Sequence, residues 1–232
     1  MRLLRTGSIA ALLVTALALA AATASAALVG IYRNGMAGKG QLGQIAKLSG
    51  ERCGRSATAG ALEVLVGRGT RECSYRTPVV GRDLEIAATG RLLGRTPKPL
   101  HRATFLALEL RSGDGARYQL AVYPGQRKSQ LRKLLPSGGV EYLQIEKGVA
   151  AIEGVERPND LRLRAFNVTA GEERGNCRIL AWVGRELVAD VTDEAAGELS
   201  GRASGFSVGS AKVAKGARAT FDDVVVRTPS PF

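Results

Sequence analysis

The stretch FLALELRSGDGARYQLAVY, residues 105–123, decides the fold class of this chain. Leucine occupies every second position from 106 to 110, and apolar side chains again occupy every second position from 118 to 122. This period of two is typical of strands that bury one face. The tetrapeptide Ser112-Gly113-Asp114-Gly115 lies between the two runs, and Asp-Gly is typical of tight hairpin turns because both positions accept a positive φ. The stretch therefore predicts an antiparallel β-hairpin.

The same alternation continues on both sides of this hairpin. It predicts further strands over 61–66, 84–92, 143–145, 161–166, 179–183, 186–191 and 217–227. Gly184-Arg185 marks a second tight turn, and a phase slip at Asp222-Asp223 predicts a β-bulge. Weak helical spacing over 41–48 predicts at most one short helix. Ten or more strands separated by Gly, Pro and Asp turns predict an all-β antiparallel sandwich of two sheets.

The N-terminus has the pattern of an export segment. Arg2 and Arg5 precede an apolar run over 9–22, and Ala24-Ser25-Ala26 has the small residues of a signal-peptidase site. We expect residues 1–26 to be a signal peptide or, if uncleaved, an N-terminal membrane anchor, because the uncharged stretch is long enough to cross a bilayer. In both cases the basic residues that precede it predict an extracytoplasmic chain, either secreted or anchored to the membrane. We expect an irregular segment over 27–60 and one sandwich domain over 61–232.

The chain has a single histidine and three cysteines among its 232 residues, and these small numbers limit which metal sites and disulfides it can form. A zinc site with four Cys or His ligands would use all of them, so we expect no metal site. Cysteines in an extracytoplasmic protein usually form disulfides, and three pairings are open from the sequence. We favour Cys53–Cys73, which flank an apolar run and a turn. Cys177 then remains as a buried thiol inside an apolar stretch.

The chain is basic, with 33 Lys and Arg residues, 21 Asp and Glu residues and a net charge of +12. The export segment contributes two Arg and no acid, so the remaining body carries +10. A strongly basic protein can bind nucleic acid, but the sequence has no nucleic-acid-binding motif. The charge therefore indicates an anionic surface outside the cell, or no specific partner.

The last third of the chain carries a resemblance to a known group of proteins. It contains Asn159-Asp160-Leu161-Arg162-Leu163-Arg164-Ala165, then Ile179–Val188 around Gly184-Arg185, then Gly197 and Gly201, and then Ala219–Val226. This succession resembles the concanavalin A-like lectin/glucanase superfamily, especially its laminin G-like and keto-disaccharide hydrolase-like domains. The resemblance covers roughly residues 60 to 227 and implies a jelly roll of two curved antiparallel sheets. The matching residues hold the fold and do not supply a function.

The resemblance also brings catalytic motifs against which the sequence can be compared. Glycoside hydrolases of this superfamily carry E-x-D-x-x-E or E-x-D-x-E on one strand face, since retention needs two carboxyl groups about 5–5.5 Å apart. No such set occurs here. The Gln-x-His motif of the alginate lyases has Glu146 in place of the histidine, and His101 lies at a strand entrance. We therefore expect no catalytic residues, and a polysaccharide lyase or hydrolase is the alternative.

Calcium is the usual cofactor of lectin-like members of the superfamily. Asp222-Asp223 could contribute ligands, but calcium needs six to eight oxygens and no dense Asp/Asn loop is present. Bulge or turn roles explain these acids better, so we expect no cofactor and keep calcium as the alternative.

Binding has more support than catalysis. Sugar sites use aromatic platforms, for which Trp182 and Tyr118 are the candidates, while Arg162 and Arg164 share one strand face and could form a basic surface. In the opposing interpretation Trp182 packs in the core and the arginines are scattered over solvated surface. We expect an exported, non-catalytic module that binds carbohydrate or an anionic cell-envelope polymer. A structural or adhesion domain without a glycan ligand is a further alternative.

Overall fold

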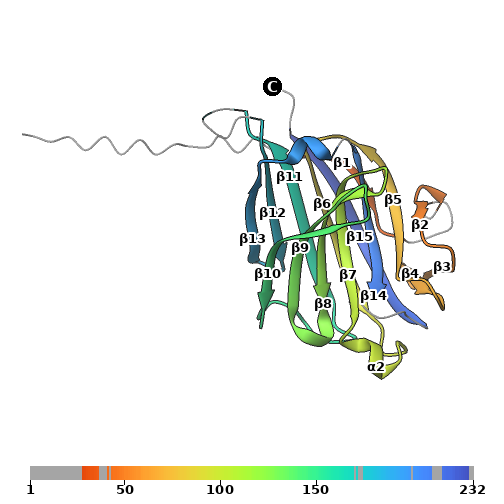
Figure 1. Ribbon diagram of the computed structural model, residues 1–232. Helices are drawn as coiled ribbons and strands as arrows, with labels where there is room; N and C mark the ends of the chain where they lie inside the picture. Colours follow the sequence, from red (N-terminus) through yellow and green to blue (C-terminus); the bar gives the residue numbers. More distant parts are fainter. Residues whose placement is uncertain are drawn as a thin grey trace, which may run out of the picture.

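The structure is a computed structural model, and it describes residues 28–36, 41, 43–169, 171, 175–199, 201–210 and 216–229. The expected export segment, residues 1–26, lies outside the described residues. Two antiparallel sheets stack face to face, and a four-residue helix, α2 (Lys98–His101), lies at one end of the sandwich (Figure 1). The predicted all-β antiparallel sandwich of two sheets is thus confirmed.

Sheet A has eight strands. In spatial order it contains β13 (Glu186–Asp193), β12 (Cys177–Val183), β11 (Asn159–Asn167), β6 (Leu84–Leu92), β15 (Ala217–Pro229), β4 (Ala61–Val66) and β3 (Cys53–Thr58). The eighth strand, β1 (Leu28–Asn34), pairs with the C-terminal part of β15. Strand β15 is long enough to pair with β4 through its first residues and with β1 through its last ones.

Sheet B has seven strands. Their spatial order is β10 (Val140–Lys147), β9 (Lys128–Leu134), β8 (Ala116–Tyr123), β7 (Thr104–Gly113), β14 (Ala203–Ser210), β5 (Glu72–Val80) and β2 (Ala46–Ser49). Two short 3-10 turns, η1 (Pro124–Gln126) and η2 (Ala196–Glu198), follow β8 and β13.

The core lies between the two sheets and is filled by the alternating apolar residues. Leu106, Leu108 and Leu110 of β7 are buried there with the inward side chains of β6, β11 and β12. Aromatic rings join the layers, because the Phe206 ring of sheet B lies 4.7 Å from the Phe221 ring of sheet A, measured between centroids. Such contacts stabilise the stacking beyond the burial of apolar area.

The predicted turns and the bulge are confirmed. Asp114 and Gly115 have φ of 50° and 82°, as a two-residue hairpin turn requires, and Gly184 has φ of 56° at the second hairpin. The register of β15 against β6 shifts between Asp222 and Val225, and Asp223 has φ of 47°. The extra residue restores the phase that the sequence pattern loses there.

One expectation for the N-terminal part is wrong, and another holds only in part. The described residues within 27–60 are not irregular, because β1 pairs with β15, β2 pairs with β5 and β3 pairs with β4. Helical backbone is present at Gln41 and Gly43, as the spacing over 41–48 predicts, but Ala46–Ser49 form β2. In both cases hydrogen bonding to a neighbouring strand far away in sequence outweighs the weak local pattern.

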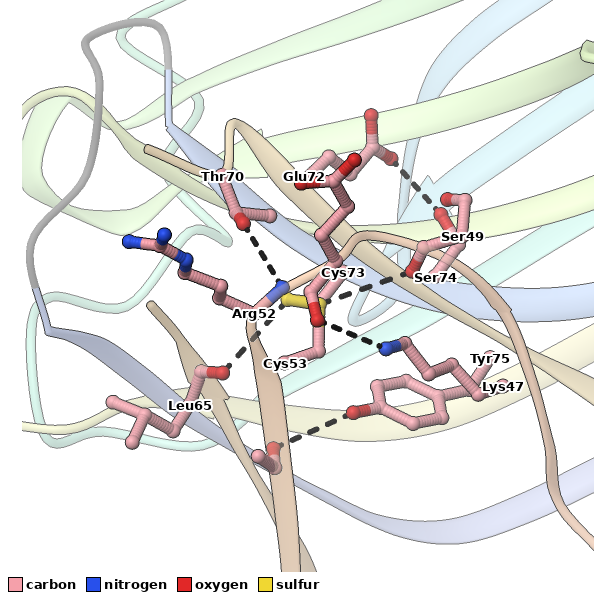
Figure 2. The surroundings of a disulfide bond; sticks show 12 residues. Lys47, Ser49, Arg52, Cys53, Leu65, Thr70, Glu72, Cys73, Ser74 and Tyr75 are labelled. Carbon is pink, nitrogen blue, oxygen red and sulfur yellow. Dashed lines mark hydrogen bonds between the residues drawn. A yellow bond between two sulfur atoms is a disulfide. The ribbon is translucent and has the colours of Figure 1, made fainter. Parts of the chain in front are cut away.

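The disulfide between Cys53 and Cys73 is confirmed (Figure 2). Cys53 lies on β3 of sheet A and Cys73 on β5 of sheet B, so the bond joins the two layers at one edge. A disulfide is typical of proteins outside the cytoplasm. Cys177 is a buried free thiol, as expected, and burial raises its pKa to about 11. No described helix is long and apolar enough to span a membrane.

A buried ion pair also joins the two layers. The Nζ atom of Lys133 on β9 lies 3.0 Å from Oδ2 of Asp193 at the end of β13, and both side chains are almost completely buried. Tyr118 donates its hydroxyl hydrogen to the same Oδ2 atom at 2.5 Å, and Lys133 also donates to the carbonyl oxygen of Ala195 at 2.9 Å. These bonds satisfy a charge that would otherwise be costly to bury.

Candidate functional site

The outer face of sheet B carries polar side chains in rows that run across the strands. One row, set by the strand register, contains Tyr142, Arg132, Gln119, Glu109, Gly205 and Arg76. The next row has small residues at its centre and contains Ile145, Gln130, Ala121, Ala107, Ser207, Ser74 and Ser49. A third row contains Lys147, Lys128, Tyr123, Phe105, Gly209 and Glu72. The middle row therefore has small side chains at its centre and lies between rows of larger ones.

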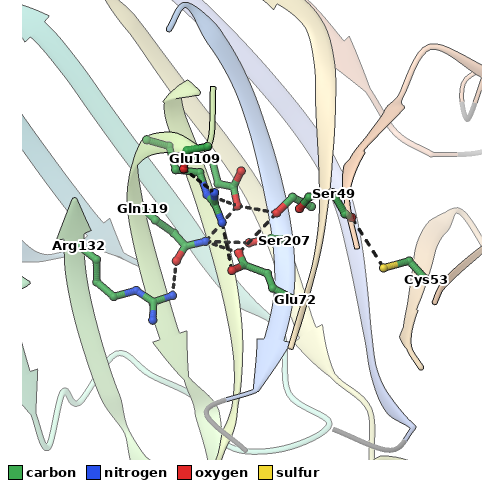
Figure 3. A network of polar contacts seen from close by, with 10 residues as sticks. Ser49, Cys53, Glu72, Glu109, Gln119, Arg132 and Ser207 are labelled. Atoms are coloured by element: carbon green, nitrogen blue, oxygen red, sulfur yellow. Dashed lines mark hydrogen bonds and ion pairs between the residues drawn. The ribbon is translucent and has the colours of Figure 1, made fainter. Parts of the chain in front are cut away.

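Side chains of the neighbouring rows bond to one another over this middle row. Gln119 donates through Nε2 to carboxylate oxygens of Glu72, at 2.5 Å, and of Glu109, at 3.0 Å (Figure 3). Arg117 forms ion pairs with both carboxylates, each at 3.1 Å. Ser74 donates to Glu109 at 3.1 Å. Gln119 also donates to Oγ of Ser207 at 3.0 Å and accepts a hydrogen bond from Arg132 at Oε1. We call this set the polar network, and it comprises Glu72, Ser74, Glu109, Arg117, Gln119, Arg132 and Ser207.

The two carboxylates of the polar network are held in different protonation environments. Burial raises the pKa of Glu109, and the neighbouring charge of Glu72 raises it further against the lowering effect of Arg117. Burial also acts to raise the pKa of Glu72, but the charges of Arg117 and Arg132 and hydrogen bonds from Ser207 and Gln119 outweigh it and lower the pKa. The opposite shifts favour a state in which Glu109 holds a proton while Glu72 is ionised.

Four buried side-chain atoms in or beside the network have no hydrogen-bond partner within the part of the chain that the structure describes. They are Oε2 of Glu109, Nε of Arg117, Oε1 of Gln130 and Nε of Arg132. Nε of Arg117 still lies 3.1 Å from Oε1 of Glu109 in an ion pair. Buried polar atoms are normally paired with protein groups or with ordered water. This group can both donate and accept, so it can take a ligand that carries hydroxyl groups.

Aromatic and apolar side chains adjoin these atoms. The Phe105 and Tyr123 rings lie 5.4 Å apart, with the Arg132 guanidinium 4.6 Å from the first and the Lys128 ammonium 4.1 Å from the second. At the edge of the sheet, three outward side chains of β10 are largely exposed, namely Val140 (45%), Tyr142 (53%) and Ile145 (44%). An exposed apolar strip beside unpaired polar atoms is typical of a binding surface.

The opposite pKa shifts give a test of this geometry. The raised folded-state pKa of Glu109 means that its stabilising contribution is present below the unfolded pKa of about 4.3 and is lost as pH rises through the folded pKa. The Glu109→Gln variant has no carboxyl group to ionise and does not lose stability in this way. The difference between its free energy of unfolding and that of the wild type should therefore become more favourable to the variant from acid to neutral pH. Urea unfolding over that range measures the change.

Glu72→Gln is the matched control for that measurement. The lowered pKa of Glu72 gives stability that is present above the unfolded pKa and lost as pH falls. The free energy of unfolding of this variant relative to wild type should therefore fall with rising pH. Equal slopes for the two variants would contradict the assignment.

The structure brings together three of the four residues expected to bind ligand. Arg162 and Trp182 are register partners on the outer face of sheet A, with the guanidinium carbon of Arg162 4.0 Å from the Trp182 ring centroid. Arg164 follows on the same face and lies 4.8 Å from the Phe166 ring. Tyr118 is separate, because it is buried between the sheets and bonded to Asp193.

Several solved structures have an architecture similar to that of this chain. The carbohydrate binding module CBM66 from Bacillus subtilis is 15% identical, with a TM-score of 0.59 over 80% of this chain and 96% of that chain. A Bacillus subtilis protein of unknown function with a galectin-like fold is 11% identical (TM-score 0.61, 87% and 98%). The Crh5 transglycosylase in complex with NAG is 9% identical (TM-score 0.55, 86% and 84%). The fold is a concanavalin A-like jelly roll. No protein-family model and no curated protein sequence matches the chain.

Known jelly rolls of this type include binding modules and enzymes, so the fold leaves both functions open. No group of three or more His, Cys, Asp or Glu side chains within the described ranges could hold a metal ion. The acids considered for calcium have protein partners, since Asp222 accepts the backbone N–H of Asp223 at 2.7 Å and Asp223 faces Arg33 at 3.4 Å.

The carboxylate pair was not predicted from the sequence. The catalytic motifs of the superfamily place their acids on a single strand, whereas Glu72 lies on β5 and Glu109 on β7, with β14 between them. The available signal was the polar phase of each alternating strand. Glu109 and Gln119 occupy the outward positions of the hairpin that decided the fold class.

Proposed function

We propose that the protein is an exported, non-catalytic module that binds carbohydrate on the outer face of sheet B. The observation that carries this proposal is the exposed strip of Val140, Tyr142 and Ile145 on β10, which borders the unpartnered buried atoms of Gln130 and Arg132. Sugar hydroxyl groups both donate and accept hydrogen bonds, and the apolar face of a sugar ring packs on aromatic rings. The resemblance of the fold to CBM66, a carbohydrate binding module, supports the same class of ligand.

The exposed strip on β10 supplies the outer part of the proposed site. Tyr142 lies opposite Arg132 and Ile145 lies opposite Gln130, so both side chains border the unpartnered atoms. A polysaccharide lying along this strip would contact Tyr142 and Ile145 and, next to them, the edge of the polar network at Arg132. Such a contact would bury apolar surface that is now open to solvent.

Binding of the full chain to a glycan array tests the proposal, and calorimetry with the best ligand gives the affinity. Tyr142→Ala is expected to weaken binding about tenfold, which corresponds to about 1.4 kcal/mol, because it removes an aromatic contact with the ligand. Leu187→Ala is the matched control, because Leu187 is similarly exposed (49%) but lies on β13 of sheet A. It should leave the affinity unchanged.

Failure of the whole array, or equal losses for the two variants, would contradict the proposal. The paired carboxylates favour glycoside hydrolysis as a second candidate function, since such enzymes use two acids with separated pKa values. Glu109 is fully buried, however, and a general acid must reach the glycosidic oxygen. If the protein releases new reducing ends from the bound glycan and the Glu109→Gln variant does not, the protein is a glycoside hydrolase and the binding-module proposal is wrong.

A further inference from the structure

The outer face of sheet A carries a second and separate surface, formed by Arg162, Arg164, Phe166 and Trp182. We call it the arginine surface. Both guanidinium groups lie against aromatic rings, Arg162 on Trp182 at 4.0 Å and Arg164 on Phe166 at 4.8 Å. Stacking holds a guanidinium plane in place, so that less conformational freedom is lost when its N–H groups bind a partner.

These two arginines differ from other cations on the same sheet. Arg178 is paired with Asp190 at 2.7 Å, Arg218 with Glu63 at 2.8 Å and Arg227 with Glu85 at 2.7 Å. Neither Arg162 nor Arg164 has an ion-pair partner among the described residues, although Glu85 lies opposite Arg164 in the register. The Glu85 carboxylate forms its ion pair with Arg227, so it does not pair with Arg164.

A shallow depression adjoins Arg162. It has a volume of about 380 Å³ and is lined by Ala87, Asp160, Leu161, Arg162, Gly184, Arg185 and Arg227. The small side chain of Ala87, which is opposite Arg162 on β6, leaves this space open. Asp160 is the only acid in the lining, and its carboxylate accepts a hydrogen bond from Thr89 at 2.8 Å. The lining therefore has an excess of positive charge.

We propose that the arginine surface binds the carboxylate groups of an acidic polysaccharide. A guanidinium group matches a carboxylate through two parallel N–H bonds, and a cation with no acid of its own keeps those donors available. Arg162 and Arg164 are two residues apart on β11, so their positions repeat about 7 Å along the strand. A polymer with regularly spaced carboxylates can meet both, and its sugar rings can lie against Trp182.

Trp182 gives a local readout, because it is the only tryptophan in the chain. Titration of the full chain with polygalacturonate is expected to change the tryptophan fluorescence in a saturable manner. The change should weaken with added salt, as screening predicts. Neutral dextran should leave the emission unchanged, and dextran sulfate shows whether sulfate replaces carboxylate.

Variants separate a built site from general attraction to a basic protein. Arg162→Ala and Arg164→Ala are each expected to weaken polygalacturonate binding about tenfold, the loss typical of a charge-assisted bond. Arg178→Ala removes the same charge from the same sheet but from an existing ion pair, so its effect should be several-fold smaller. Arg162→Lys keeps the charge without the planar fork and should recover only part of the affinity, which covers the case in which Arg162→Ala does not fold.

The proposal is overturned if Arg178→Ala costs as much as Arg162→Ala, because only net charge would then matter. Polygalacturonate binding that leaves the Trp182 emission unchanged would also overturn it, as would tighter binding of duplex DNA. Tyr142→Ala on sheet B should retain the fluorescence response. The failure of one surface is therefore distinguishable from the failure of the other.

Discussion

Replacement of Asp193 by alanine is expected to lower the free energy of unfolding by about 3–5 kcal/mol, the range typical of breaking a buried ion pair. The variant would leave the Lys133 ammonium group buried without its carboxylate. It would also remove the acceptor of the Tyr118 hydroxyl. Because Lys133 belongs to sheet B and Asp193 to sheet A, the substitution weakens the contact between the two layers.

Urea unfolding followed by circular dichroism measures this effect. Asp190→Ala is the matched control, since it removes a carboxylate from the exposed pair with Arg178, for which a loss below about 1 kcal/mol is expected. Adding Lys133→Met to Asp193→Ala should recover part of the stability, because no unpaired charge remains. A loss for Asp193→Ala no larger than that of the control would show that the pair does not hold the layers together.

Loss of the Cys53–Cys73 disulfide is expected to lower the free energy of unfolding by about 3 kcal/mol. The bond closes a loop with a sequence separation of 20 residues, and in the chain-entropy model a loop of this size gives about that stabilisation. The double variant Cys53→Ser/Cys73→Ser tests this value in the same unfolding experiment.

Wild-type protein unfolded in the presence of a reductant should match the double variant. Beside the bond, the backbone N–H of Arg52 donates to Oγ1 of Thr70 at 3.3 Å, and this hydrogen bond remains in the variant because it involves neither cysteine side chain (Figure 2). Cys177→Ala is the control for the reductant, because Cys177 is already a free thiol. A reductant that lowers the stability of the double variant as well would act elsewhere and would remove the support for this assignment.

The strands with clear alternation were predictable from the sequence, and those without it were not. Strand β9 contains Lys133 and Arg132 on opposite faces, so it lacks an apolar phase, and Lys133 is buried only because Asp193 is there to pair with it. Strand β14 is rich in glycine and serine and is buried on both faces between β5 and β7. Its small residues fit the close approach of neighbours, since a Cβ atom at Gly205 would lie 2.3 Å from the carbonyl oxygen of Tyr75.

The candidate sites were predictable only in part. Arg162 and Trp182 were expected to act together, and the register of β11 and β12 makes them neighbours. The ligand-binding expectation for Tyr118 stays a prediction, although the alternation already put Tyr118 on the same strand face as Leu120 and Val122, which are buried in the core. Glu72 and Glu109 could not be paired, because no local pattern shows that β14 enters the sheet between them.

The position of β14 and β15 has a consequence for the order of folding. These two strands lie inside sheets B and A, yet they come from the last thirty residues of the chain. The protein is synthesised from its N-terminus, so β5 and β7 have no strand between them to pair with until β14 (Ala203–Ser210) has been made. In the same way, β4 and β6 lack their common partner until β15 (Ala217–Pro229) has been made. Each layer can therefore close only after its late inner strand has been synthesised, which for sheet A means after Pro229. Pairing over such long sequence separations is slow, and a chain that has not yet closed its sheets can still be threaded through a narrow channel.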